Sequence, residues 1–528
     1  MRSLGRDGGD TVEGESIPPS QGGRVHYHHT GWDGESKQKA VDLTRTAMIC
    51  ISIAQESRRF ALADMLNASR QCDLLEVRLD RFGKAPEVGE MLAVKPKPVI
   101  FSCRRPRDGG QWDGSEEERL AILRQCIICK ADYVEIELDV ADQIRPFPPA
   151  KRVIAYTNRQ ETPANIAEIY AQAQSKKPDV IKLTTLARTP EEAWPLVQIL
   201  ARAPVPTVVV GLGKPGVMLS VLGAKIGAPW TYAALERGME AHPDQPTVSD
   251  LENVYHYRAI HRSTRLIGVT GFGERERATV AALNAAFAYL QLPARCLPLG
   301  VGNVRLFGKV IEAVKLAAAV IDDEHRRTIL QIVAEREPSA ARTGEADLIL
   351  YRDNKWHAAD TRIQATVNAL EAAMKARSGT EHPLAGRMVL LAGVNERTRI
   401  MGRELAKHGS VLIVASRDRD AAQQLAQQLK CRFVPFEALY STMHDVLIVC
   451  EESNIHPGYL KPGMTVLDLT APLASSPLLR DAQARGCAVV TPRQLWLAQT
   501  ALQAHLLTSK DVPRQVLAEA ASWLTEEE

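Results

Sequence analysis

Short apolar runs alternate with amphipathic stretches from Met48 to about Tyr257. Each apolar run has the length of a strand and is rich in β-branched residues, and most are followed by apolar residues at helical spacing. Eight such strand–helix units in roughly 210 residues predict a parallel (β/α)8 barrel. The predicted strands are 49–53, 74–79, 99–103, 133–138, 152–156, 180–184, 207–211 and 231–235, and the helices include 58–68, 117–129, 163–173, 190–201 and 217–226.

The second half of the chain repeats this alternation in two further blocks. The first block, 265–376, predicts a small α/β domain with strands at 266–270, 295–298, 317–321 and 347–351 and helices at 275–290, 304–313, 323–333 and 362–376. The second block, 387–500, predicts a Rossmann-like, doubly wound sheet with strands at 388–392, 411–415, 446–450, 464–469 and 488–491 and helices at 398–408 and 420–429.

The stretch before the barrel contains Gly, Ser, His and Pro without sustained periodicity, which is typical of disorder. Met48 directly precedes the first strand, so translation from Met48 fits the sequence as well as translation from Met1. The predicted domains are a disordered extension (1–47), the barrel (48–260), a substrate domain (265–380) and a Rossmann-like domain with C-terminal helices (386–528).

The composition is that of an ordinary globular protein. Of the 528 residues, 45% are hydrophobic and 24% charged, and the net charge of +2 gives no field for binding nucleic acid. No apolar run reaches membrane-spanning length, and the opening residues do not show the pattern of a signal peptide, so we expect neither feature. Nine scattered cysteines indicate reduced thiols, and we interpret the lone Cys126/Cys129 pair as core residues, with no metal site. We therefore expect a cytoplasmic protein with a small-molecule substrate and no membrane or nucleic-acid partner.

One lysine, Lys182, lies within the apolar, β-branched run 179–185. A charged lysine in a buried strand is costly unless paired, and desolvation favours the neutral amine, which is a nucleophile able to form a Schiff base with a carbonyl substrate. The alternative is a side chain at the strand end that extends to solvent.

Other ionisable residues stand late in predicted strands. Glu76 and Arg78 are two residues apart, so both face the same side of their strand, and Arg104 follows the next strand. Because the C-terminal ends of barrel strands carry the active site, this set favours a site for an anionic ligand with a carbonyl group. Buried structural ion pairs are the alternative at any one position.

These segments resemble the type I 3-dehydroquinate dehydratases of the shikimate pathway. The resemblance implies that Lys182 forms the imine with 3-dehydroquinate, which is dehydrated to 3-dehydroshikimate without a cofactor. It also implies that Ser52, Glu76, Arg78, Arg104 and Gln245 bind the substrate. The segments that carry it are Ile51-Ser52, Glu76-Val-Arg78-Leu-Asp80, Ser102-Cys-Arg104-Arg-Pro-Arg-Asp108-Gly-Gly110, Val180-Ile-Lys182 and Pro243-Asp-Gln245-Pro.

Three positions depart from the family pattern. Thr157 stands where the family has the histidine that takes the proton next to the imine and helps the hydroxyl leave. The run Met218-Leu-Ser-Val221 has no arginine for the substrate carboxylate, and Ala241 replaces a serine. Loss of a general base costs about 10²–10⁴-fold in rate, so we expect imine formation with inefficient dehydration. His242, in the loop after the eighth strand, is a candidate replacement base.

The second half resembles shikimate dehydrogenase. The resemblance rests on Gly268-Val-Thr-Gly271 through Asn284-Ala-Ala-Phe287, on Pro472-Leu473 with Ser476-Pro477-Leu-Leu479, and on Gln499. It implies substrate binding by Thr279 and Gln499. The two serines that bind the substrate carboxylate in the family fall on Arg277 and Thr279, so only one hydroxyl remains. No lysine is present in 323–326, where the family has its catalytic lysine. Arg362 stands where the family has the aspartate that pairs with that lysine.

The cofactor turn of that half is altered as well. Its sequence is Ala392-Gly393-Val394-Asn395-Glu396-Arg397, with one glycine and a carboxylate that repels pyrophosphate unless Arg397 offsets it. Ser416 and Arg417 match the residues that hold the 2′-phosphate of NADP in the family. We expect binding of NADP by Gly393, Ser416 and Arg417 to be poor or absent.

Three hypotheses stay open from the sequence. The first is a dehydratase fused to an impaired shikimate dehydrogenase-like half. The second is a degenerate paralogue that acts as a partner or ligand sensor. The third is a Schiff-base lyase that uses Lys182 on another keto acid. A homodimer is implied by the resemblance alone.

Overall fold

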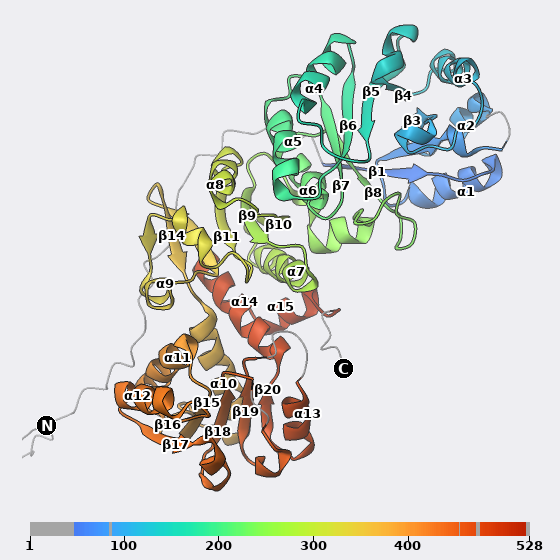
Figure 1. Ribbon diagram of the computed structural model, residues 1–528. Helices are drawn as coiled ribbons and strands as arrows, with labels where there is room; N and C mark the ends of the chain where they lie inside the picture. The colour runs from blue at the N-terminus through green and yellow to red at the C-terminus, as the bar shows by residue number, and fades with distance from the viewer. Residues whose placement is uncertain (1–46, 84–86, 453–454, 471–475, 524–528) are drawn as a thin grey trace, which may run out of the picture.

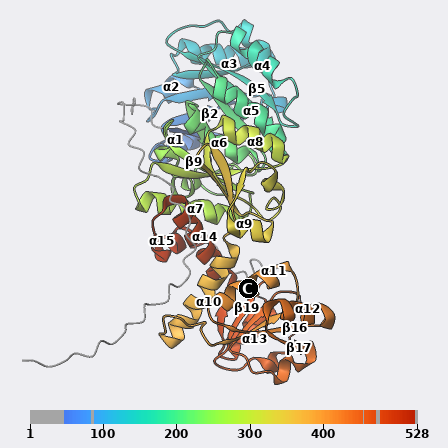
Figure 2. The same cartoon turned by 90° about the vertical axis from the view of Figure 1, so that its left-hand side faces the viewer.

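The computed structural model describes residues 47–83, 87–452, 455–470 and 476–523. The predicted extension before Met48 lies outside these residues, apart from Ala47, and so do Pro472 and Leu473. Three sheets of eight, six and six strands follow one another along the chain. Figure 2 shows them one above another, with the barrel at the top, the substrate domain in the middle and the Rossmann-like domain at the bottom.

The first sheet is the predicted barrel. All of its assigned ladders are parallel, in the order β7-β6-β5-β4-β3-β2-β1-β8, so β7 and β8 meet at the seam of a nearly closed barrel. Its strands are β1 Met48–Ile53, β2 Leu74–Arg78, β3 Val99–Ser102, β4 Tyr133–Glu137, β5 Lys151–Asn158, β6 Val180–Leu186, β7 Thr207–Leu212 and β8 Trp230–Ala233. Its helices are α1 Arg58–Ala68, α2 Val88–Ala93, α3 Glu116–Ile128, α4 Ile166–Ser175, α5 Pro190–Arg202 and α6 Gly216–Ile226.

Helix starts in the barrel follow local capping chemistry. Ser57 accepts a hydrogen bond from the backbone of Phe60 at the start of α1. Ser115 and Glu118 form a reciprocal capping box at the start of α3. These caps explain why both helices begin within one residue of their predicted positions.

The substrate domain has a mixed sheet in the order β10-β9-β11-β13-β14-β12. The predicted helix at 323–333 is wrong: the chain forms a turn and then a short 3₁₀ segment, Thr328–Gln331. Asp322 accepts hydrogen bonds from the backbone of Glu324 and His325, which holds the turn in place of a helix. The elements are β9 Arg265–Thr270, α7 Glu274–Tyr289, β10 Ala294–Leu299, α8 Val304–Ala313, β11 Leu316–Val320, β12 Glu335–Arg336, α9 Pro338–Thr343, β13 Leu348–Arg352, β14 Lys355–Ala359 and α10 Arg362–Ser378.

The third sheet is the predicted doubly wound one. It is fully parallel in the order β17-β16-β15-β18-β19-β20, and it includes a strand, β17, that the pattern did not reveal. Its elements are β15 Met388–Ala392, α11 Glu396–Lys407, β16 Val411–Ser416, α12 Arg419–Leu429, β17 Arg432–Pro435, β18 Val446–Val449, β19 Thr465–Asp468, α13 Pro477–Ala484 and β20 Ala488–Val490.

Two C-terminal helices return to the substrate domain. Helix α14 (Pro492–Thr508) and helix α15 (Arg514–Ala520) both pack against α7, as Figure 1 shows by their place between the two C-terminal sheets. Trp496 and Leu517 on these helices are buried in the same core as α7. The chain therefore passes through the Rossmann-like domain and comes back.

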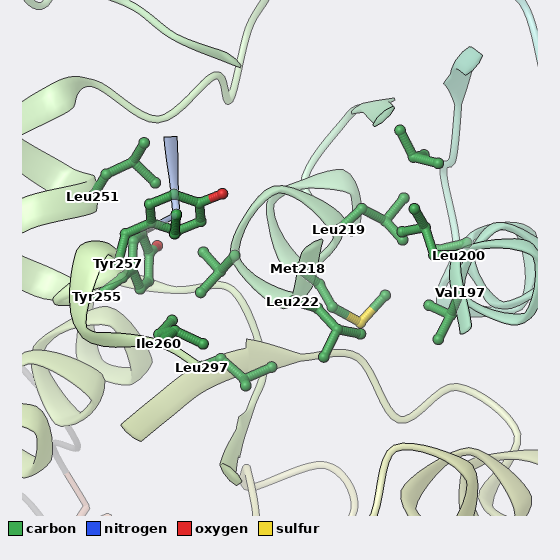
Figure 3. Packing of buried hydrophobic residues seen from close by; sticks show 14 of the residues in the cluster. Val197, Leu200, Met218, Leu219, Leu222, Leu251, Tyr255, Tyr257, Ile260 and Leu297 are labelled. Carbon is green, nitrogen blue, oxygen red and sulfur yellow. The ribbon is translucent and has the colours of Figure 1, made fainter. Parts of the chain in front are cut away.

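The barrel and the substrate domain share one hydrophobic core. Met218 and Leu222 of α6 face Leu297 of β10, and Tyr257 of the connecting segment is fully buried beside them (Figure 3). The Rossmann-like domain has separate clusters on the two faces of its sheet. In the part of the chain that is described, no helix is long and apolar enough to cross a membrane.

Candidate active site

Four charged side chains converge inside the barrel from four strands or strand ends. Glu76 lies in β2, Arg104 two residues after the end of β3, Glu135 in β4 and Lys182 in β6. Glu76, Glu135 and Lys182 are buried, with 1%, 3% and 3% of their surface exposed. The predicted lysine therefore does not extend to solvent; its side chain ends in the lumen.

The four groups form one ion-paired network. The Lys182 ammonium lies 2.9 Å from the Glu135 carboxylate and 3.7 Å from that of Glu76. The Arg104 guanidinium donates to Glu135 at 2.7 Å and also to Glu76. Two carboxylates and two cations balance, which is the condition for keeping four charges out of water.

Glu76 is held as an anion by the charges around it. Burial alone would raise its pKa, but the charges of Arg104, Lys182 and Arg78 outweigh burial, so the pKa of Glu76 lies well below its usual range. Ser52 and Ser102 donate their hydroxyl hydrogens to its two oxygens, the latter at 3.0 Å. Glu76 is thus a fixed anion, and Ser52, a predicted substrate residue, is hydrogen-bonded to it.

Arg78 is buried beside the network but is already engaged. Its guanidinium makes a bidentate contact with Asp80, at 3.0 and 2.8 Å, and donates to the backbone oxygen of Gly109 at 3.1 Å. Asp80 in turn accepts from the backbone of Arg104 and Gln111. Arg78 therefore anchors the loop that carries Arg104.

Gln245 is buried at the barrel mouth, where its side-chain oxygen accepts from the backbone of Ala241 at 2.7 Å. It lines a cavity of about 580 Å³ together with His242 and with Phe272 and Arg277 of the substrate domain. His242 contacts the backbone oxygen of Pro243 through Nδ1 at 2.8 Å, and burial lowers its pKa. Lys182 is not among the residues that line this cavity.

The altered positions lie as follows. Thr157 is half-buried in β5, on the same strand face as Ala155, whose partner in the ladder is Lys182. Val221 is fully buried in α6, within the core. No arginine occurs in α6, so the substrate carboxylate has no clamp from that helix.

The sequence analysis missed Glu135 and Tyr232, which both contact Lys182. The ring of Tyr232, in β8, lies 4.3 Å from the Lys182 nitrogen. The signal for Glu135 was available, since Glu135 and Glu137 alternate with apolar residues in one strand and so face the lumen side together. Tyr232 gave no such signal, because a tyrosine in a strand is ordinary.

In the second half, Thr279 and Gln499 line the same small cavity of about 30 Å³, the scale of one water. Thr279 accepts from the Trp496 indole at 2.9 Å. Gln499 accepts from Arg275 at 2.9 Å and donates to Asp347 at 2.6 Å. The two predicted substrate residues therefore line one cavity. Their polar groups are already hydrogen-bonded to protein side chains, and the remaining space is too small for a substrate.

The remaining dehydrogenase positions form internal ion pairs. Arg362 binds Asp360 and Glu345, the latter at 2.6 Å. Arg326 binds Asp323, and Arg277 points away to Asp250. Among the described residues, Asp322, Glu324 and His325 have oxygen and nitrogen atoms close enough to hold a cation. However, Asp322 Oδ1 already accepts from the backbone of the turn, and Oδ2 accepts from the Thr270 hydroxyl.

The cofactor turn keeps its backbone shape. Gly393 has φ +105°, and a Cβ at this position would lie 2.7 Å from the Glu451 side chain. Glu396 pairs with Arg399 at 2.9 Å, and Arg397 is not its partner. Arg397 is half-buried near Arg362 and Asp360, and burial lowers its pKa. Glu451 packs against Gly393 through its backbone and first side-chain carbons, and Glu396, paired with Arg399, is the first residue of the helix that follows the turn.

Ser416 and Arg417 stand at the end of β16, as predicted. Ser416 is buried and accepts from the backbone of Asp418 at 3.2 Å. Arg417 is exposed, with its guanidinium 5.3 Å from the Phe436 ring centre. An exposed cation at this strand end is a group that can pair with a phosphate.

Comparison with known proteins gives the same division of the chain. Residues 49–262 match the family model of the type I 3-dehydroquinases. A 3-dehydroquinate dehydratase from Methanopyrus kandleri is 32% identical over 183 residues, which are 34% of this chain and 84% of the relative. The chloroplastic bifunctional 3-dehydroquinate dehydratase/shikimate dehydrogenase of Arabidopsis thaliana is 24% identical over 475 residues, 84% of this chain and 79% of the relative.

Among solved structures, the dehydroquinate dehydratase and shikimate dehydrogenase of S. pombe AroM covers 91% of this chain, with 99% of its own length, at 16% identity and a TM-score of 0.43. The barrel, its lysine network and the sequence matches lead to one conclusion. The chain belongs to the type I 3-dehydroquinate dehydratase family and carries a shikimate dehydrogenase-like half behind its barrel.

Proposed function

We propose that the barrel converts 3-dehydroquinate to 3-dehydroshikimate through an imine on Lys182. The observation that carries this proposal is the position of the Lys182 amine, buried in the lumen and paired with Glu135 at 2.9 Å. A structural ion pair needs only one carboxylate, whereas this lumen holds two carboxylates and two cations from separate strands. The family membership of residues 49–262 supports the same chemistry.

Each side chain has a role in this scheme. Glu135 accepts the ammonium proton of Lys182, which frees the amine for attack on the substrate ketone. Arg104 compensates the carboxylates of Glu76 and Glu135 and, with Ser52 and Glu76, forms the predicted substrate surface, while Gln245 lines the cavity at the barrel mouth. Arg78 positions the Arg104 loop through Asp80 and Gly109.

Borohydride trapping tests the imine directly. We expect 3-dehydroquinate plus borohydride to add one reduced substrate to the wild-type protein, measured by intact mass and located at Lys182 by peptide mapping. Lys182→Ala abolishes the adduct, and Lys182→Arg does so while keeping a cation beside Glu135. Absence of the wild-type adduct, under conditions that label an authentic type I enzyme, overturns the proposal.

For the second half we propose impaired turnover. The supporting observation is that the cavity at Thr279 and Gln499 measures only about 30 Å³ and that both side chains are already hydrogen-bonded, Thr279 to Trp496 and Gln499 to Arg275 and Asp347. The catalytic lysine expected from the resemblance to shikimate dehydrogenase has no counterpart in 323–326. Ser416 and Arg417 fit a 2′-phosphate, but Glu396 and Glu451 oppose the pyrophosphate, so we propose weak or absent NADP binding.

Two assays test this half. NADPH titration, followed by the fluorescence of the nicotinamide, measures cofactor binding, and absorbance at the NADPH wavelength with shikimate and NADP measures turnover. Micromolar NADPH binding together with shikimate oxidation would reinstate a full dehydrogenase.

The assembly and the compartment are further proposals from the resemblance and the sequence. We propose a cytoplasmic homodimer. Light scattering on the purified chain and cell fractionation measure these two properties separately.

A further inference from the structure

Tyr232 is a buried side chain of the barrel that the scheme above does not use. It lies in β8, and its ladder partner in β1 is Cys50. Its side chain packs with the inward-facing residues Cys50, Val180 and Trp230 in the lumen cluster. Only 6% of Tyr232 is exposed, so its hydroxyl is out of contact with bulk water.

The hydroxyl of Tyr232 has no hydrogen-bond partner among the described residues. Burial of an unpaired hydroxyl costs free energy, about 1–3 kcal/mol in protein mutational data, so such a group is expected to serve a purpose. The unpaired hydroxyl belongs to a ring whose centre lies 4.3 Å from the Lys182 nitrogen, the atom that would attack the substrate.

The electrostatics set the protonation state of this hydroxyl. Burial, together with the charges of Glu76 and Glu135, raises the pKa of Tyr232 well above its usual value. The resting hydroxyl is therefore protonated and available as a hydrogen-bond donor to the substrate. The ring face also favours a cation at the Lys182 nitrogen, which is what an iminium is.

The dehydration needs a group that both gives and takes protons at the imine. Thr157, on the strand next to Lys182, has a hydroxyl that cannot act as a base near neutrality. Within the proposed function, and resting on it, we propose that Tyr232 is this acid–base group, acting from β8 in place of a residue on β5.

The proton balance closes with Tyr232 alone. The carbinolamine on Lys182 loses its hydroxyl as water: the C–O bond breaks, the oxygen takes the Tyr232 proton, and the nitrogen lone pair forms the C=N bond. The products are an iminium and a phenolate. The phenolate then removes a proton from the carbon next to the iminium, which gives a neutral enamine and restores the tyrosine hydroxyl.

The second half of the cycle repeats the same exchange. The enamine electrons form the new C=C bond and the C=N bond as the β-hydroxyl leaves, and that hydroxyl takes the Tyr232 proton and departs as water. A further water adds to the iminium, giving its proton to the phenolate. The resulting carbinolamine collapses to the ketone product as its hydroxyl proton passes to the Lys182 nitrogen.

The test is Tyr232→Phe, which keeps the ring face over Lys182 and removes only the hydroxyl. Tyr257→Phe is the matched control, because the Tyr257 hydroxyl is also buried without a hydrogen-bond partner among the described residues but lies in the core between domains. Three quantities are measured for each variant: formation of enone product from 3-dehydroquinate, the rate of borohydride-trapped adduct at Lys182, and the thermal midpoint.

We expect Tyr232→Phe to lower turnover by about 10²–10⁴-fold, to slow the trapped adduct, and to keep the thermal midpoint at or above that of the wild type, because an unpaired buried hydroxyl is removed. Tyr257→Phe should change neither turnover nor trapping. If the wild type forms the adduct and Tyr232→Phe turns over at the wild-type rate, the role of Tyr232 is overturned and the imine stands. If the wild type forms no adduct, the proposed function falls, and the role of Tyr232 falls with it.

Discussion

Lys182 and Glu135 are 47 positions apart in the chain, and their charged groups lie 2.9 Å apart inside the barrel. Removing one member of a buried pair costs about 3–5 kcal/mol when the other is left unpaired, but Glu135 keeps Arg104 as a second cation. We therefore predict that Lys182→Ala lowers the free energy of unfolding by a smaller amount, about 1–3 kcal/mol, measured by urea denaturation. Lys182→Arg keeps the charge and should lose less; equal stability of Lys182→Ala and the wild type would contradict the pairing.

Glu76 predicts a dependence of stability on pH. Its pKa is lower in the folded chain than in the unfolded one, so its ionised form stabilises the fold above the unfolded carboxyl pKa of about 4.3. This contribution is lost as the pH falls through the depressed folded pKa. Glu76→Gln should therefore be less stable than the wild type at pH 7, and the difference should shrink below about pH 4. Urea titrations across this range measure the difference, and a gap independent of pH would argue against an ionised Glu76.

Thr157 offers a gain-of-function test. Its side chain shares the strand face of Ala155, the ladder partner of Lys182, so a histidine there is expected to reach the imine. We predict that Thr157→His raises the turnover of 3-dehydroquinate by about 10²-fold or more. Asn158→His, on the opposite face of the same strand, is the control and should give no gain. Turnover unchanged in both variants would show that a base is not what limits this barrel.

His242 provides a contrasting expectation. It lines the cavity at the domain junction, and its Nδ1 atom contacts the Pro243 carbonyl. We predict that His242→Ala leaves dehydratase turnover within twofold of the wild type, about 0.4 kcal/mol in the barrier. A large loss in the product assay would instead assign the missing base to this loop.

The strand pattern was sufficient for the barrel and for Lys182, because parallel strands buried on both sides read as apolar runs in which one lysine stands out. It was not sufficient for the partners of Lys182. Glu135 and Tyr232 come from β4 and β8, and only closure of the barrel brings them to β6. The turn at Asp322 was predicted as helix because periodicity does not register a side chain that bonds the local backbone.

The cofactor turn makes a prediction about charge. Glu451 packs against Gly393 and Glu396 begins the helix that follows the turn, and their charges oppose a pyrophosphate placed there. We predict that Glu396→Gln with Glu451→Gln strengthens NADPH binding by about tenfold, or 1.4 kcal/mol, in a fluorescence titration at low salt. Adding Arg417→Ala should reverse the gain. Unchanged affinity in the double variant would place the obstacle elsewhere in the domain.

The core drawn in Figure 3 determines how the chain melts. Because Met218 and Leu222 of the barrel are covered by Leu297 of the next domain, neither part has a complete interior without the other. Heating should therefore produce one calorimetric transition for the barrel and substrate domain together, and a second for the Rossmann-like sheet with its own clusters. Cutting the chain after Arg262 would expose the apolar surfaces of α6 and β10 to water, so each fragment should be less stable and more prone to aggregate than the intact chain.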